Sequence, residues 1–378
     1  MIDFQVTEVS EDTKYNQVKD SIIAAIRSGK LAPLSKLPSI SQIAKDAKVS
    51  LRTADLALQA LIEERYCFRR PKKGTFVEVG QRVETRPVCG VLGHVDPIGY
   101  SFRAYLYAEL MELSILKNVP ALTFPTPSGE SGLGISGEMI RSCDNSNEYD
   151  IKGIFILDSD HYLYGVKLAE AFPGIRFFFL NYEREDFDKM PSNMAAIVDD
   201  NYGGSRQLAE SVFKEYHPKS IVYLNCPLKE GDITYQERER GVLDTAKKCG
   251  VKCFPTIEVP RSSYSLDQID FAYEAFGKFL KTKKVDFMFA PNLHLARGVR
   301  KVIEEMGLSD EIGVAGYGGF DYSAEERIST VHSPLREMCQ RGFSEMLNPE
   351  FRMPQVIKLM PEIIACSKPE VSNKKHSK

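Results

Sequence analysis

The sequence predicts an α/β protein in which a small helical domain, ending in a hairpin, precedes two lobes of doubly wound parallel sheet. Apolar residues recur at helical spacing between Lys14 and Leu61, and a basic turn then separates two short β-prone runs. From Val88 onward, apolar strand-like runs alternate with helical stretches, which is typical of parallel sheets. The roughly 280 residues of this part are too many for one small sheet, so we expect two similar lobes.

The overall composition is that of an ordinary globular protein. The chain has 378 residues, 43% hydrophobic and 27% charged, which suits two or three domains. Its longest apolar runs, such as residues 177–180, are too short to cross a bilayer. The first fifteen residues lack the basic and apolar regions of a signal peptide, so we expect a cytoplasmic protein without a membrane partner.

Charge and cysteine usage narrow the function classes further. Residues 1–80 hold 13 Lys and Arg against 10 Asp and Glu, whereas the remainder holds 36 against 42, so a net charge of +3 precedes one of −6. This asymmetry fits a nucleic-acid-binding domain on an acidic body. The eight cysteines are scattered, and the closest pair, Cys249 and Cys253, has no CxxC or histidine partner. We therefore expect free thiols in a reducing compartment and no metal site.

The strongest local signal is a helix that starts after Ser50, a good N-cap residue. Its apolar face is formed by residues at helical spacing: Leu51, Ala54, Ala57, Leu58 and Leu61. The other side carries mainly Arg52, Thr53, Asp55 and Gln59. Two short runs, 66–68 and 75–77, follow and are joined by the basic turn Arg69–Gly74, which predicts a hairpin. A helix followed by a cationic hairpin has the shape of a recognition helix and a wing that contacts phosphates.

Two further helices are expected before the recognition helix. From Lys14, the apolar stripe of the first is stopped by Gly29; it consists of Tyr15, Val18, Ile22, Ile23 and Ile26. Ser39 and Gln42 stand at capping-box spacing at the start of the second. Lys48 and Val49 form the turn into the recognition helix.

Residues 14–79 resemble the winged helix-turn-helix domain of GntR-type transcription regulators. The matching stretches are YNQVKDSIIAAIRSGKLAP, LPSISQIAKDAKVS and KKGTFV. The family usually has arginines that contact the operator where this chain has Ser41, Leu51 and Asp55, so its base-reading set cannot be copied; Lys45 is one nearby substitute. The resemblance implies a homodimer on double-stranded operator DNA. The expected DNA-facing residues are Ser39, Ser41, Gln42, Lys48, Ser50, Arg52, Thr53, Arg70, Lys72, Lys73, Gly74 and Thr75.

Polar residues without apolar periodicity, 80–87, are expected to form a linker. The strands expected beyond it are Val88–Val95, Val119–Phe124, Ile151–Leu157, Ile175–Leu180, Ala195–Val198, Ser220–Leu224, Phe254–Val259, Val285–Ala290 and Ile312–Ala315. Ligands of such folds bind beyond the carboxyl ends of the strands.

The second part resembles the effector domain of LacI-type repressors, which is itself similar to periplasmic sugar-binding proteins. The matching pieces are VDDNYGGSRQLAESVF, the segment 235–250 with Arg238 three residues before Gly241, PNLHLARGVRKVIEEMGL, IGVAGYGG and ISTVHSPLREM. A GntR-type head on such a body resembles arabinose-repressor-like regulators. This implies a DNA-binding domain at 1–79, an effector and dimerisation domain at 88–368 and a disordered tail at 369–378. The expected lobes are about 88–193 with 332–348 and about 195–330 with 353–366.

The resemblance implies a sugar-like effector held in the cleft by Arg238, whose planar fork suits paired oxygens. Two aspartates that the family uses are Leu293 and Gly318 here, so Asp321, Asp158 or Asp160 substitutes or the ligand is not a typical free sugar. Alternative roles remain open: a surface arginine for Arg238, helix capping for Asn292 and core packing for Tyr100 and Phe102. The expected effector-binding residues are Tyr100, Phe102, Arg238, Tyr264, Asn292, His294 and Tyr317.

Three functional hypotheses follow. The first is a ligand-responsive DNA-binding regulator, expected to repress carbohydrate-utilisation genes. The second is an enzyme with a DNA-binding head, but the chain shows no matching Schiff-base lysine motif, no G-x-S-x-G and no HExxH, so we expect neither catalysis nor a cofactor. The third is a regulator whose body only dimerises and has lost ligand binding.

Overall fold

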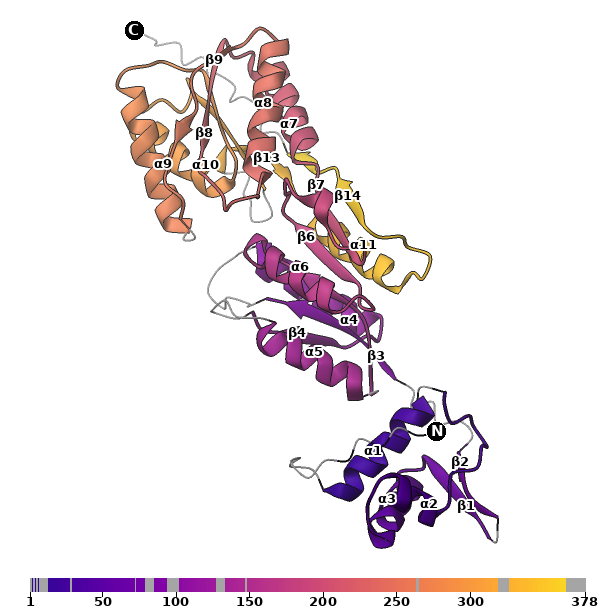
Figure 1. Cartoon of the computed structure of the whole chain (residues 1–378). Coiled ribbons are helices and arrows are strands. Elements are labelled where there is room, and N and C mark those ends of the chain that lie inside the picture. Colours follow the sequence, from indigo (N-terminus) through magenta and orange to yellow (C-terminus); the bar gives the residue numbers. More distant parts are fainter. Residues whose placement is uncertain are drawn as a thin grey trace, which may run out of the picture. The chain divides into compact units, whose positions relative to one another are not determined.

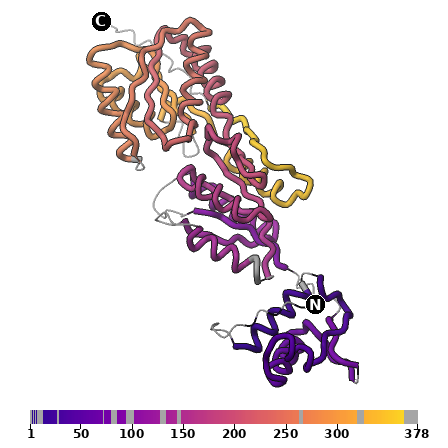
Figure 2. Tube along the Cα trace, viewed as in Figure 1, coloured from indigo at the N-terminus to yellow at the C-terminus, as the bar shows by residue number. Residues whose placement is uncertain are grey.

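The computed structural model describes residues 2, 4, 6, 13–27, 29–71, 73–78, 85–93, 102–126, 133–146, 148–262, 265–318 and 326–364 (Figures 1 and 2). The chain forms two compact units, Met1–Arg86 and Pro87–Lys378. The expected tail, 369–378, and most of the expected linker, 80–87, lie outside the described residues.

The first unit contains three helices and a hairpin, as the sequence predicts. The helices are α1 (Lys14–Arg27), α2 (Ile40–Asp46) and α3 (Leu51–Glu63), and the antiparallel strands are β1 (Cys67–Arg70) and β2 (Gly74–Val77). The helices enclose a core that includes Val18, Ile22, Ile43, Leu58 and Leu61. Both expected N-caps are formed, because the hydroxyls of Ser39 and Ser50 accept hydrogen bonds from the amides of Gln42 and Thr53.

The first sheet of the second unit has the strand order β14-β7-β6-β5-β3-β4. Its strands are β3 (Arg86–Leu92), β4 (Ala121–Phe124), β5 (Tyr149–Ile156), β6 (Phe177–Asn181), β7 (Met194–Asp199) and β14 (Gln355–Leu359). Helices α4 (Phe102–Leu116), α5 (Gly134–Ser146), α6 (Tyr162–Ala171) and α11 (Leu335–Leu347) pack around it (Figure 1). Side chains of β6 alternate between two cores: Phe177 and Phe179 enter one, and Phe178 and Leu180 enter the other.

The second sheet has the order β10-β8-β11-β12-β13-β15, with β9 beside β8. Its strands are β8 (Ser220–Asn225), β9 (Lys252–Cys253), β10 (Ile257–Glu258), β11 (Phe287–Ala290), β12 (Gly313–Tyr317), β13 (Ser329–His332) and β15 (Glu362–Ile364). Helices α7 (Asn201–Tyr216) and α8 (Thr234–Lys248) bound one core, and α9 (Ser265–Leu280) and α10 (Leu293–Glu305) bound the other. The pairings are parallel except that of β13 with β15, so the predicted fold class is confirmed.

The expected lobe boundaries need correction. We expected 195–330 and 353–366 in the second lobe, but β7 and β14 pair with each other in the first sheet. The chain therefore crosses between the lobes after Asp199, after His332 and after Leu359. Strand β14 was not predicted from the sequence because it is a half-exposed edge strand rather than an apolar run.

Four strands of the second unit, β9, β13, β14 and β15, have no counterpart among the expected ones. The expected strand Phe254–Val259 is also wrong in part. Only the two-residue strand β10 lies within it, and Pro255 separates β10 from β9. Proline has no amide hydrogen to donate to a sheet, so it interrupts pairing at this edge.

Within the described residues, no helix is long and apolar enough to span a membrane. The seven cysteines of this part are free thiols, and no group of three or more His, Cys, Asp or Glu side chains there could hold a metal ion.

Helices α9 and α10 approach each other closely at Gly298, and this contact gives a test of the fold. A Cβ atom at this residue would lie 2.1 Å from the carbonyl oxygen of Ile269. Gly298→Ala should therefore push α9 away and lower the free energy of unfolding by about 1–3 kcal/mol, as overpacking usually does. Urea unfolding of the full chain, followed by circular dichroism, measures this loss.

Gly277 in α9 provides the matched control, because a Cβ atom there would approach only Val302, at 3.4 Å. Gly277→Ala should be neutral or stabilise the chain by up to about 1 kcal/mol, since it removes a glycine from a helix interior. Equal stabilities of the two variants would contradict the close helix crossing.

Candidate functional site

The first turn of α3 presents the expected recognition residues. The Ser50 hydroxyl accepts from the Thr53 amide at 3.0 Å and contacts the Thr53 hydroxyl at 2.8 Å, so these two side chains cap the helix. Arg52 is exposed on the side away from the core, and Leu51 is exposed beside it. On the next turn, Asp55 accepts from Gln59 at 3.1 Å. Arg52 is therefore the charged donor that this turn offers to a partner.

The expected residues before α3 are exposed but are partly used by the domain itself. Ser39 caps α2 and contacts the Ser41 hydroxyl at 2.9 Å. Gln42 does not complete the capping box; its amide donates to Asp46 at 2.7 Å. Lys48 is exposed in the turn before α3, with a left-handed backbone at φ 55°.

The hairpin carries an exposed basic edge. Arg70 lies over the rings of Phe68 and Phe76, with its guanidinium carbon 5.1 and 5.2 Å from their centroids, which holds the charge at the strand end. Lys73 and Gly74 are exposed, and Lys72 lies outside the described residues. Thr75 differs from the expectation: its side chain is 7% exposed and faces the domain, so it is not available to DNA.

A cavity of about 240 Å³ lies between the two lobes of the second unit. Its walls are the segments that follow the carboxyl ends of β3, β5 and β6 from one sheet and of β8, β10 and β11 from the other. Adjacent parallel strands bring such segments together, which makes this edge the usual ligand site. The lining residues are Phe102, Arg103, Asp158, Ser159, Asp160, Tyr182, Cys226, Leu228, Lys229, Asp232, Tyr235, Arg261, Ser262, Gln268, Asn292 and His294.

The charges that line this cavity balance. Arg103 pairs with Asp158 at 2.8 Å within the first lobe. Lys229 and Arg261, from the second lobe, both pair with Asp160 of the first. Together with Asp232, which is 3% exposed, these residues make three cations and three carboxylates.

Neutral hydrogen-bonding groups occupy the second-lobe wall. The Asn292 side chain caps α10 by accepting from the Leu295 amide at 2.9 Å, and it donates to the Tyr235 hydroxyl at 2.7 Å and to Gln268 at 2.9 Å. Asn292 is thus both a helix cap and a wall residue, which joins the two roles that the sequence left open. Burial raises the pKa of Tyr235 to about 12, so this hydroxyl keeps its proton.

Arg238 lies beneath this wall rather than in it. Its guanidinium donates to the Asn201 side chain and to the Pro291 carbonyl, both at 2.8 Å, and is 3.8 Å from Asp199. Its carbon atom stacks 3.7 Å from the centroid of Tyr317. Arg238 is 5% exposed and is not among the lining residues, so it supports the wall through its neighbours.

The other expected effector residues divide into three groups. Phe102, Asn292 and His294 line the cavity, as do the possible substitutes Asp158 and Asp160. Tyr317 packs below it against Arg238. Tyr100, Tyr264 and Asp321 lie outside the described residues.

Sequence reasoning missed several lining residues, above all Arg103, Lys229, Asp232, Arg261 and Gln268. The available signal was position, because Lys229 and Asp232 follow the expected strand Ser220–Leu224 at its carboxyl end. Gly318, where the family has an aspartate, has φ 88°, and a Cβ there would lie 2.8 Å from the Phe102 ring.

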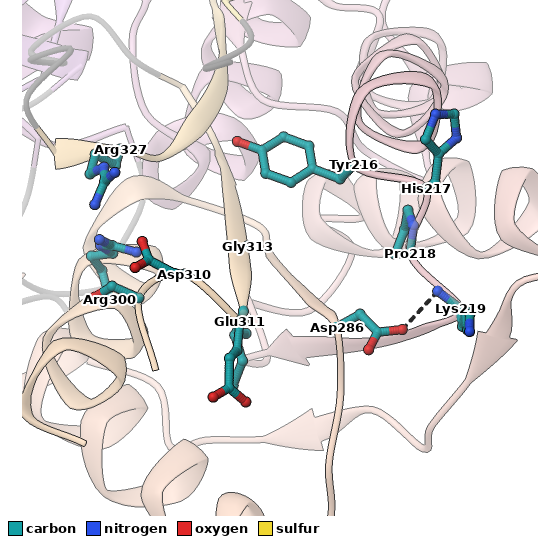
Figure 3. A pocket seen from close by; sticks show the side chains of 12 residues that line it. Tyr216, His217, Pro218, Lys219, Asp286, Arg300, Asp310, Glu311, Gly313 and Arg327 are labelled. Carbon is teal, nitrogen blue, oxygen red and sulfur yellow. Dashed lines mark hydrogen bonds between the residues drawn. The ribbon is translucent and has the colours of Figure 1, made fainter. Parts of the chain in front are cut away.

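A second cavity, of about 300 Å³, lies at the opposite edge of the second sheet, before β8, β11 and β12 (Figure 3). There the Asp286 carboxylate accepts from the amides of Lys219 and Ser220 at 2.7 and 2.9 Å. This carboxylate, just before β11, therefore holds the start of β11 beside the start of β8. The amino ends of parallel strands are not the usual ligand edge, which makes the inter-lobe cavity the better candidate for a ligand site.

Asp199 is fully buried, and burial raises its pKa from 3.8 to about 6, against the opposing effects of Arg238 and the Ser333 hydroxyl. The folded chain thus binds this proton more tightly than the unfolded chain, and the resulting stability is lost as the pH rises through the folded pKa. Relative to Asp199→Asn, the wild-type chain should lose about 2–3 kcal/mol of unfolding free energy between pH 4 and pH 7. Urea unfolding at each pH measures this difference, and parallel pH profiles would contradict it.

The comparisons with known proteins agree with this two-part architecture. Residues 14–77 match the profile of the family described as "Bacterial regulatory proteins, gntR family". The chain is similar to the arabinose metabolism transcriptional repressor of Halalkalibacterium halodurans, with 23% identity over 353 residues that cover 86% of each protein.

Solved structures show the fold of the second unit. A LacI family transcriptional regulator from Enterococcus faecium, with bound ribose, aligns with a TM-score of 0.55 and 17% identity over 74% of this chain and 99% of that one. The lac repressor dimer, bound to operator and the anti-inducer ONPF, aligns with a TM-score of 0.58 and 14% identity over 77% of this chain and 98% of that one. The chain is therefore a transcriptional regulator in its coarse architecture, with residues 14–77 matching the gntR family and a following body that has the LacI-type fold.

Proposed function

We propose that this regulator binds operator DNA as a homodimer through its first unit and releases or retains it according to a neutral sugar bound between the lobes of its second unit. The observation that carries the proposal is the inter-lobe cavity, which lies at the ligand edge of both sheets. Its target genes would be those of carbohydrate utilisation, and it would act in the cytoplasm. The gntR-family match and the arabinose repressor relative support the DNA-binding and regulatory parts.

The charge balance of the cavity favours an uncharged ligand. Each of the three cations has a carboxylate partner among the lining residues, so an anionic ligand would have to break an existing pair. Sugar hydroxyls both donate and accept, so they can bond to Asp232 and to amide groups such as that of Gln268 without separating charges. The cavity is also smaller than the ~300–1,000 Å³ usual for drug-sized ligands, which favours a monosaccharide.

The relatives suggest which sugars to try first. The curated relative is named for arabinose metabolism, and the E. faecium regulator was solved with ribose, so we propose a pentose such as arabinose. The alternative, a body that only dimerises, rests on Leu293 and Gly318 in place of aspartates. Asp158, Asp160 and Asp232 offer carboxylates in the same cavity, and this favours ligand binding.

Ligand binding would act by shifting the arrangement of the lobes. The ligand can do this only to the extent that it binds one arrangement more tightly than another. Because walls from both lobes enclose the cavity, a sugar that contacts both walls favours the closed arrangement. In a dimer, such a change would alter how the paired DNA-binding domains meet two half-sites, which lie about 34–36 Å or a multiple of this apart.

The ligand proposal is tested by a thermal-shift screen of uncharged monosaccharides, starting with arabinose and ribose, on the full chain. A bound sugar should raise the melting temperature by mass action. At a free sugar concentration of 100 times the dissociation constant, the folded state is stabilised by about 2.7 kcal/mol. Asp232→Asn should reduce or abolish the shift, because the carboxylate is the stronger acceptor. The amide still accepts the local hydrogen bond that Asp232 receives from the Thr234 amide at 3.0 Å.

Asp270→Asn is the control, since it removes an exposed carboxylate of α9 outside the cavity and should keep the full shift. If no monosaccharide shifts the wild-type melting temperature, the ligand proposal is rejected and the alternative, a body that only dimerises, is favoured. If Asp232→Asn responds like wild type, the cavity is not the binding site.

The DNA-binding proposal is tested on the hairpin. Replacing Lys72 and Lys73 by Ala should weaken binding to every duplex, because phosphate contacts carry little sequence information. The slope of log affinity against log salt should fall by about one unit for each lost phosphate contact. Fluorescence anisotropy with labelled duplex at several salt concentrations measures both effects.

The matched control replaces Lys247 and Lys248, two exposed lysines near the end of α8, by Ala. This variant loses the same charge from the second unit and should keep the wild-type slope. Identical salt slopes in all three proteins would overturn the assignment of the hairpin as a wing.

A further inference from the structure

Leu51 is the first residue of α3, and its side chain is 60% exposed. The packing face of this helix is formed by four other residues, Ala54, Ala57, Leu58 and Leu61, all buried. Leu51 therefore contributes little to the core, and it is the most exposed large apolar side chain among the described residues of this unit. Its position is what matters, because the first residues of a recognition helix are the ones that reach base edges in the major groove.

The polar side chains around Leu51 are engaged with one another. Ser50 and Thr53 share a contact at 2.8 Å, and Asp55 accepts from Gln59 at 3.1 Å and from Arg69 at 3.4 Å. Among the described exposed residues of the first two turns, the side chains that make no such contact are Leu51, Arg52 and, farther along, Leu56. The capacity of this helix tip to read bases thus falls mainly on one cation and one apolar group.

We infer that Leu51 reads thymine by contacting its 5-methyl group in the major groove. This inference rests on the proposed function, because it requires α3 to be the recognition helix. The thymine methyl is the apolar group that base edges present in the major groove, and apolar side chains recognise it. The first residues of a recognition helix are the ones that reach base edges. Leucine cannot hydrogen-bond to a base, so burial of this methyl is the contact it can make.

The neighbouring Arg52 refines this expectation. Successive residues of a helix point about 100° apart, so the two side chains reach different base pairs from the same turn. Arginine donates best to guanine, whereas leucine favours thymine. Each half-site should therefore contain a methyl-dependent thymine close to a base pair that Arg52 reads.

The test removes the methyl group without changing the base pairing. A duplex is first enriched from a random-sequence library by the full chain, and each of its thymines is then replaced singly by deoxyuridine. We expect one thymine in each half-site at which this replacement weakens wild-type binding about fourfold, the value for burying one methyl-sized group. Leu51→Ala should bind the thymine duplex more weakly by a similar factor and should show no further loss with deoxyuridine.

Two further variants make the outcome specific. Leu56→Ala, which truncates an exposed leucine (43%) of the same helix, should keep the full deoxyuridine effect. Leu51→Arg should shift the preference at this position from thymine to guanine in a new enrichment. The inference is overturned if deoxyuridine has no effect at any thymine, or if Leu51→Ala retains the wild-type deoxyuridine loss. If the wild-type chain enriches no duplex at all, the proposed function fails, and this inference with it.

Discussion

A buried hydrogen-bonded network around Arg238 and Asp199 is the constraint on which the second unit depends. Asp199 ends β7 at the first crossover between the lobes, and its carboxylate also accepts from the Ser333 hydroxyl at the second crossover, at 2.7 Å. Arg238 reaches from α8 to this carboxylate, to Asn201 and to the segment before α10. Breaking one partner of such a buried pair is far more costly than losing an exposed one, because the other charge stays desolvated. This network links the first two crossovers to each other and supports, from below, the residues that line the cavity.

The two lobes are joined by contacts of different strength. Main-chain hydrogen bonds link them where the Ile233 amide donates to the Glu183 carbonyl at 2.9 Å and the Glu185 amide to the Gly231 carbonyl at 3.0 Å. Lys229 and Arg261 also pair with Asp160, through side chains that are 38–45% exposed. Exposed ion pairs contribute little to stability, so the main-chain hydrogen bonds are the stronger of these two links. A ligand that contacts both walls can then decide the lobe arrangement.

In the first unit, several polar side chains are also used to stabilise the fold. Ser39, Ser50 and Thr53 satisfy helix starts, and Arg70 is held against two aromatic rings. These residue types are common at DNA-contacting positions, yet here they first stabilise the domain. Under the proposed function, the exposed residues Arg52 and Leu51, whose side chains make no such contacts, are left to recognise bases. Stability and specificity are thus divided between neighbouring residues of one short helix.

The sequence by itself determined the elements whose signals are local. Helix periodicity, the N-caps at Ser39 and Ser50 and the basic turn predicted the first unit, and strand alternation predicted two parallel sheets. Only the tertiary structure decided which distant segments meet. It placed β14 beside β7, set Arg238 under the wall rather than in it, and brought Asp158 and Asp232 to one cavity. The reason is physical: caps and periodicity depend on neighbours a few residues away, whereas edge-strand pairing and side-chain direction depend on packing between segments that no local pattern relates.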